Sequence, residues 1–155
     1  MIAPQTAPAG PAGLHNPLDA LLGYQLRRAS TVMMAHLGAA LAETGLTPTE
    51  ASILLLIDAN PACTQSDLGR ALAIKRANMV PLMSGLLKRG AVERAPVDGR
   101  SQALSITANG QALVADVRSR IDRHEQCFQG QFDAKALDAM IAGLQLIRAT
   151  VQDEA

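Results

Sequence analysis

The sequence predicts a mainly α-helical fold that carries one small β-hairpin. Hydrophobic residues make up 48% of the chain but aromatic residues only 2%, so the core is built from aliphatic side chains, and a chain rich in Leu and Ala favours helices. Apolar residues recur three and four positions apart along most of the sequence, whereas a two-residue period appears only between residues 92 and 106. With 155 residues, the chain is long enough for one domain, or for one domain and a dimerisation element.

The N-terminal part of the chain contains a predicted tail and a predicted long helix. Residues 1–17 hold four prolines among small and polar residues, which predicts a disordered tail. From Leu18 the apolar residues keep helical spacing until Gly45, which ends the helix because glycine readily takes the left-handed conformation. A helix this long in a chain this short needs a partner along its length.

Two helix starts with capping chemistry follow this helix. Thr47-Pro48-Thr49-Glu50 combines an N-cap threonine, a first-turn proline and a glutamate three residues after the cap. The nearly continuous apolar run over residues 51–58 then predicts a central, buried helix. Thr64 and Asp67 form a second capped start, which predicts a short helix that ends in a turn at residues 73–74.

A third helix is predicted from Lys75 to Arg89, and Gly90 stops it. Alternation over residues 92–95 and 102–106 predicts two short strands, with turn chemistry in the intervening residues 96–99. The buried face of the third helix is expected to consist of Met79, Leu82, Met83 and Leu86.

Two further helices are predicted after the hairpin. Thr107 caps one helix that Gly130 ends, and Asp133 caps the last helix. The earlier of the two is expected to carry Leu113, Val117, Ile121, His124 and Phe128 on one side. The apolar stripe of the last helix comprises Leu137, Met140, Ile141, Leu144, Ile147 and Val151.

Charge is distributed unevenly although the formal net charge is zero. Residues 63–100 contain seven basic and three acidic residues, a net charge of +4, so the rest of the chain carries −4. A basic middle between acidic ends suggests a nucleic-acid partner, although random variation among solvated faces is the simpler alternative.

The order of these elements is that of a winged helix-turn-helix. Two short helices meet at a tight turn, the second starts with basic residues, and the hairpin is tipped by Asp98-Gly99-Arg100. A helix of this kind fits the major groove of DNA, the N–H groups at the start of the short helix after Thr64 suit a phosphate, and an arginine in the hairpin suits the narrow minor groove.

The chain resembles the MarR-type transcriptional regulators over about residues 18–152. The stretches that carry the resemblance are residues 22–29, 45–48, 65–72, 75–90, 92–94, 98–100 and 106–110. The resemblance implies a homodimer in which the first and last helices intertwine, residues 18–45 and 133–155 here. It also implies a winged helix-turn-helix domain with a connecting helix over residues 46–132, palindromic operator DNA, and often a small aromatic or phenolic effector.

The residues expected to contact DNA lie at the start of the short helix, along the recognition helix and in the hairpin. Basic residues at a helix start oppose the helix dipole, which favours a role in phosphate or guanine contact, whereas the resemblance makes Asp98 the residue that orients Arg100. Solvated surface positions and an ordinary turn ion pair are the plainer alternatives. The full set is Thr64, Gln65, Ser66, Lys75, Arg76, Ala77, Asn78, Val80, Pro81, Ser84, Lys88, Arg94, Asp98 and Arg100.

Two positions depart from the family pattern. The family commonly has a polar or basic residue where Val80 and Pro81 stand, and Pro81 is expected to bend the helix because it lacks a backbone donor. Ser101 stands where the family often has a second arginine in the hairpin. Both departures reduce the expected electrostatic contact with DNA.

An effector pocket is expected between the helical region and the winged domain. Its candidate residues are Tyr24, Arg28, Met33, His36 and His124. Few polar groups in an apolar lining suit an aromatic carboxylate or a thioester derived from one, and an arginine can pair with a carboxylate. The alternative for the two histidines is a purely structural role in the core.

The leading interpretation is a ligand-responsive, DNA-binding repressor, and two alternatives remain open. One is a winged-helix module for protein–protein assembly, which has no need of several cations on one side. The other is a redox-sensing regulator that uses Cys63 or Cys127. No catalytic motif, metal-ligand spacing, cofactor motif, membrane span or signal peptide is recognised, so the expectation is a non-enzymatic cytoplasmic protein without cofactor or metal.

Overall fold

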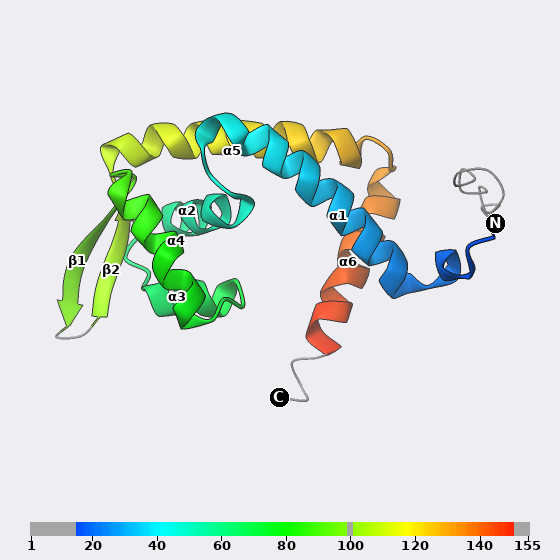
Figure 1. Cartoon of the computed structure of the whole chain (residues 1–155), viewed down its shortest axis with the longest axis horizontal. Coiled ribbons are helices and arrows are strands. Elements are labelled where there is room, and N and C mark those ends of the chain that lie inside the picture. Colours follow the sequence, from blue (N-terminus) through cyan, green and yellow to red (C-terminus); the bar gives the residue numbers. More distant parts are fainter. Residues whose placement is uncertain (1–14, 99–100, 151–155) are drawn as a thin grey trace. The chain divides into compact units, whose positions relative to one another are not determined.

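The computed structural model of the chain describes residues 15–98 and 101–150 (Figure 1). Most of the predicted tail, residues 1–14, lies outside this part, as do Arg100 and Val151. Contacts between Cα atoms divide the chain into two units, residues 1–35 and residues 36–155. The model is mainly helical with one antiparallel hairpin, as predicted.

The described part of the first unit contains a short 3-10 helix, η1 (Pro17–Ala20), and most of α1 (Leu22–Leu41). The prediction of one continuous helix from Leu18 is wrong at its start. The Asn16 side chain caps η1 by accepting a hydrogen bond from the amide of Leu18. Leu21 then takes an extended conformation, so α1 starts only after it.

The second unit begins with the last turns of α1. A 3-10 turn, η2 (Ala42–Thr44), closes the helix, and Gly45 follows with a φ of 66°. This is the left-handed conformation predicted for the glycine that ends the first helix. Helix α2 (Pro48–Ala59) starts with the predicted capping box between Thr47 and Glu50, and its buried residues include Ile53, Leu54 and Ile57.

Helices α3 (Gln65–Ala71) and α4 (Arg76–Lys88) form the predicted helix-turn-helix. A capping box between Thr64 and Asp67 starts α3, and the turn between the helices contains Ala73 with a φ of 53°. Lys75 is the N-cap residue of α4 rather than its first helical residue, and α4 continues through Pro81. The predicted inner face of α4 is confirmed, because Met79, Met83 and Leu86 are buried and Leu82 is half-buried.

Strands β1 (Val92–Asp98) and β2 (Ser101–Ile106) pair in antiparallel register from Val92↔Ile106 to Asp98↔Ser101. Both strands are longer than predicted, and the segment assigned to the turn continues as strand, with a register irregularity between Pro96 and Asp98. A proline is tolerated there because each strand of a two-stranded sheet has a free edge.

Helices α5 (Ala108–Gln129) and α6 (Ala134–Thr150) start at the predicted caps, Thr107 and Asp133. Figure 1 shows α2, α3, α4 and the hairpin gathered near the end of α5 that carries its N-terminus. Val114, Val117 and His124 of α5 are buried, whereas no residue of α6 is. None of the helices in the described ranges is long and apolar enough to cross a membrane.

Candidate nucleic-acid interface and a histidine pocket

The outer face of α4 presents basic and small apolar side chains to solvent. Arg76, Ala77, Asn78 and Pro81 are exposed, and Val80 is 54% exposed. No acidic residue lies in the first turn of α4, and its N-cap, Lys75, is exposed and makes no capping hydrogen bond with its side chain. Because the helix N-terminus is already electropositive, this face attracts an anion.

A groove of about 840 Å³ joins this face to α3 and to β1. Arg94 of β1 reaches it, and so does Arg70, which was not among the predicted contacts and pairs with Asp67 three residues earlier. Polar, basic and apolar groups therefore converge from three elements. The groove is lined by Gln65, Ser66, Gly69, Arg70, Ile74, Arg76, Met79, Val80 and Arg94.

The other residues predicted to contact DNA differ in their exposure and in their hydrogen bonds. The Thr64 hydroxyl donates to the Asp67 carboxylate at 2.7 Å and accepts from the Asp67 amide at 3.2 Å, so the α3 cap already uses it. Ser84 is half-buried and Lys88 is exposed. The backbone of Asp98 pairs with Ser101 in the hairpin, but the predicted contact between Asp98 and Arg100 falls outside the described part of the chain.

Two histidines from distant parts of the sequence meet between α1 and α5. The Nδ1 atoms of His36 and His124 lie 2.8 Å apart, and the Phe128 ring packs edge-on against both imidazoles. His124 is only 3% exposed, and its Nε2 lies 3.8 Å from a carboxylate oxygen of Glu125. A contact this short between two ring nitrogens requires one to donate a proton and the other to accept it, so the two rings cannot both be imidazolium ions.

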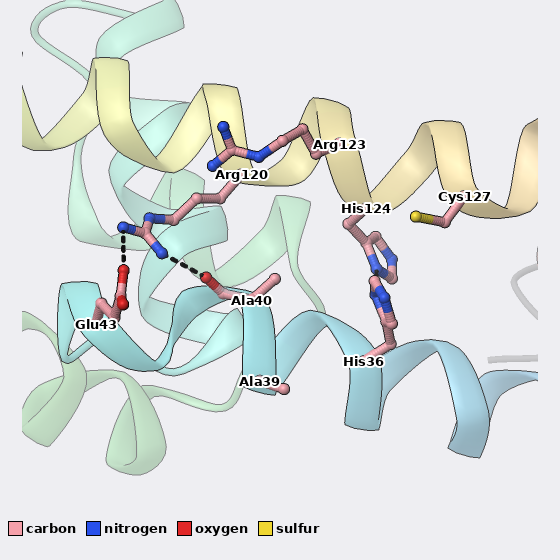
Figure 2. A pocket seen from close by; sticks show the side chains of 8 residues that line it. All are labelled: His36, Ala39, Ala40, Glu43, Arg120, Arg123, His124 and Cys127. Atoms are coloured by element: carbon pink, nitrogen blue, oxygen red, sulfur yellow. Dashed lines mark hydrogen bonds and ion pairs between the residues drawn. The ribbon is translucent and has the colours of Figure 1, made fainter.

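An open pocket of about 340 Å³ adjoins this histidine pair (Figure 2). Arg120 lines it and donates to the Glu43 carboxylate at 2.8 Å, to the Ala40 carbonyl at 3.0 Å and to the Asp116 carboxylate at 2.8 Å. The hydrogen bond to Glu43, followed by the one to Asp116, raises the pKa of Arg120. We call this the histidine pocket; its lining is His36, Ala39, Ala40, Glu43, Arg120, Arg123, His124 and Cys127.

Sequence reasoning brought His36 and His124 to one site but missed Arg120 and Arg123. Arg123 and His124 follow Arg120 by three and four residues, a spacing that places all three on one side of α5 and that could have identified the two arginines. Of the two arginines in the lining, Arg120 is already paired with the Glu43 and Asp116 carboxylates, so the Arg123 guanidinium supplies the positive charge of the pocket. The pocket can therefore accept the anionic end of a small ligand.

The other predicted effector residues, Tyr24, Arg28 and Met33, belong to the first unit. Arg28 donates to the Tyr24 hydroxyl at 3.3 Å, and Asn16 donates to the same oxygen at 3.2 Å. These hydrogen bonds, the one from Arg28 foremost, lower the pKa of Tyr24. Met33 is half-buried. A shared site with the histidine pocket stays a prediction.

The cysteines differ in their surroundings. Cys63 is half-buried, and both burial and the nearby Asp67 carboxylate raise the pKa of its thiol, which disfavours the reactive thiolate. Cys127 is exposed and lines the histidine pocket. Across residues 15–98 and 101–150, no group of three or more His, Cys, Asp or Glu side chains is placed to hold a metal ion.

Comparison with known proteins identifies regulators of transcription. Residues 44–101 match the model of the MarR family. The chain is 34% identical over 97 residues to the HTH-type transcriptional repressor Rv2887 of Mycobacterium tuberculosis, a match that covers 61% of this chain and 70% of that protein. The structure of Rv2887 in complex with salicylic acid is 27% identical, with a TM-score of 0.65 and coverage of 83% and 97%.

The transcriptional repressor CouR is similar in both sequence and structure. CouR bound to a 23-mer DNA duplex is 33% identical, with a TM-score of 0.82, and the match covers 88% of this chain and 99% of that chain. CouR bound to p-coumaroyl-CoA is 32% identical, with a TM-score of 0.77 and coverage of 84% and 94%.

Proposed function

Because this chain belongs to the MarR family of transcriptional regulators, we propose that it is a homodimeric repressor. It binds a palindromic operator and is released by a small aromatic acid or its thioester. The observation that carries the proposal is the outer face of α4. On this face, Arg76 and Val80 line a groove whose lining also includes Gln65 of α3 and Arg94 of β1.

Roles for the α4 residues follow from their chemistry. Lys75 and Arg76 supply cations for phosphates or for guanine, and Asn78 can bond adenine through two hydrogen bonds. Ala77, Val80 and Pro81 offer apolar contact to thymine methyl groups, which accounts for exposed apolar side chains on an otherwise polar face. Support also comes from CouR, a relative solved on a DNA duplex.

The DNA proposal is tested with duplexes selected from a random pool by this protein. Arg76→Ala, if the side chain reads a guanine, weakens binding to the selected duplex by about 1–3 kcal/mol and relaxes the preference at one base pair. Arg94→Ala removes the proposed phosphate contact. It therefore reduces the steepness with which the logarithm of the DNA-binding constant falls against the logarithm of the salt concentration by about 0.9. Lys135→Ala, which removes one charge from the first turn of α6, is the matched control. Equal losses for Arg76→Ala on selected and random DNA would contradict base reading.

The effector proposal is supported by the histidine pocket. Two arginines and two histidines provide donors for one anionic end, while Ala39, Ala40 and the nearby Phe128 are apolar. Rv2887 and CouR, solved with salicylic acid and with p-coumaroyl-CoA, supply two ligands of the proposed chemistry.

The effector proposal is tested by release of a preformed complex with the selected duplex. Salicylate, p-coumaroyl-CoA and a panel of aromatic acids are titrated, with the corresponding neutral amides as controls. Arg28→Ala and His36→Ala are expected to leave DNA affinity near normal but to raise the ligand concentration needed for release. Release by an oxidant through Cys63 or Cys127, with no release by any acid, would replace this mechanism by a redox one.

A further inference from the structure

Arginines from two other helices hold the end of α1. We define the α1 terminus as residues 40–45, the last two residues of α1 with η2 and Gly45. From the α5 side, Arg120 donates to the Ala40 carbonyl at 3.0 Å and to Glu43 at 2.8 Å (Figure 2). The Asp116 carboxylate, 2.8 Å from Nε, holds the guanidinium in this orientation.

The second arginine comes from the recognition helix. Arg89 is the C-cap residue of α4, and its guanidinium donates to the Thr44 carbonyl at 3.2 Å and to the Gly45 carbonyl. A Cβ at position 45 would lie 3.1 Å from Nη2 of Arg89, so the absence of a side chain on Gly45 lets the guanidinium approach this closely. The α1 terminus is thus tied to the last turn of α4.

We propose that the α1 terminus couples the histidine pocket to the recognition helix, with Arg120 and Arg89 as the two positioning residues. This inference rests on the proposed function, which assigns a ligand to the pocket and DNA to α4. Ala40, Glu43 and Arg120 all line the pocket, so an anion bound there competes with Glu43 for the Arg120 guanidinium. Loss of that ion pair loosens the terminus on the α5 side, and Arg89 carries the change to α4.

The two arginines have a second possible role, which the test has to separate from coupling. Cations are favourable near the C-terminus of a helix, so each arginine can simply stabilise the end of α1. In that case the arginines act independently, and removing Arg120 leaves α4 unchanged. Coupling predicts instead that a change at Arg120 reaches α4 and that this effect depends on Arg89.

The test measures amide hydrogen exchange of the full chain without DNA or ligand. Arg120→Met is expected to speed exchange in residues 42–46 and in the last turn of α4, residues 85–89, by about fivefold or more, the lower end of allosteric couplings. In the Arg89→Met background, adding Arg120→Met is expected to leave exchange in residues 85–89 no faster. The control is Arg118→Met, which removes an arginine of α5 that pairs with Asp58 of α2 instead.

A milder variant guards against a general loss of folding. Glu43→Gln changes an exposed carboxylate and is expected to produce a smaller effect in the same direction. Faster exchange in residues 42–46 but unchanged exchange in α4, for both Arg120→Met and Glu43→Gln, would overturn the proposal. An equal effect of Arg120→Met on exchange in residues 85–89 with and without Arg89 would also overturn the proposal. The exchange measurement contains neither DNA nor effector. Its result can therefore be interpreted even if the DNA-binding assay or the effector-release assay fails.

Discussion

Gly110 controls how closely α5 approaches the start of the hairpin. The amide of Gly110 donates to the cap hydroxyl of Thr107 at 2.9 Å, while the amide of Thr107 donates to the Ala91 carbonyl at 3.1 Å. A Cβ on residue 110 would lie 2.0 Å from that carbonyl oxygen and 2.7 Å from Cγ2 of Ile106. The Ala91 oxygen belongs to the backbone, so it cannot rotate away as a side chain could.

Gly110→Ala is therefore expected to lower the free energy of unfolding by about 1–3 kcal/mol, the usual cost of overpacking. Gly38→Ala is the matched control, because a Cβ at that helical position meets nothing within 4 Å. Urea unfolding followed by circular dichroism measures both variants. A Gly110→Ala variant as stable as wild type would contradict the close approach of α5 to Ala91.

Single residues divide into those whose role is visible in the sequence and those that need the fold. Thr107 and Asp133 could be identified as caps because capping is a local interaction. The tight site of Gly110 and the backbone hydrogen bonds of Arg89 and Arg120 could not, since Gly110 meets Ala91, 110 − 91 = 19 positions away, and the two arginines reach carbonyls 44 to 80 positions away.

Among the elements, the short helix α3 depends most on its first turn. It has seven residues, so little of its stability comes from its own hydrogen bonds, and its capping box is correspondingly important. The hydrogen bonds that Asp67 accepts, first from the Thr64 hydroxyl and then from the Thr64 amide and Arg70, lower the pKa of Asp67 below its usual 3.8. The folded chain therefore favours the carboxylate form.

Asp67→Asn is expected to lower the melting temperature at neutral pH, and this difference from wild type depends on pH. Because the folded-state pKa lies below the unfolded one, the stabilisation is fully present above the unfolded pKa and is lost as pH falls through the folded one. The two melting temperatures should therefore differ by a constant amount above about pH 5 and converge at lower pH. Calorimetry across this range is the measurement. A difference that persists unchanged below the folded pKa would exclude the charge of Asp67 as its cause.

The elements themselves were largely predictable, and their ends less so. Capping boxes at Thr47 and Thr64 and the left-handed Gly45 mark boundaries by local chemistry. The hairpin extends beyond its prediction because cross-strand pairing carries the strand past Pro96. The start of α1 was misplaced because a separate 3-10 turn with the same apolar spacing precedes it. Both errors arise where hydrogen bonding overrides residue preference.

At the scale of the whole molecule, α6 has no buried residue within the single chain. Met140, Ile141, Leu144 and Ile147 are exposed, and they follow the spacing of the predicted apolar stripe. A soluble protein rarely leaves a continuous apolar face in water, so a partner helix is expected to cover it. The sequence could predict the stripe from its period. It could not identify the covering surface, because that contact is not encoded by spacing within one chain.

We therefore predict that replacing Leu144 and Ile147 with Asp converts a dimer into a monomer. The two side chains are 39% and 41% exposed in the single chain, and both lie on the predicted stripe. If a two-fold interface buries the exposed part of them, about 40% of each side chain, four side chains are lost at about 1 kcal/mol each. The dissociation constant then rises by about three orders of magnitude. Sedimentation equilibrium measures this change, and helicity from circular dichroism checks that the variant is folded.

Leu146→Asp provides the control for this variant. Leu146 is 70% exposed and lies off the stripe, so the substitution adds the same charge to the same helix without entering the expected interface. We expect Leu146→Asp to remain dimeric and to bind the selected duplex as wild type does. The Leu144→Asp, Ile147→Asp variant should lose affinity for a two-site duplex, because a monomer occupies one half-site at a time. A folded monomer of that variant with wild-type affinity for the full palindrome would show that dimerisation through α6 is not needed for operator binding.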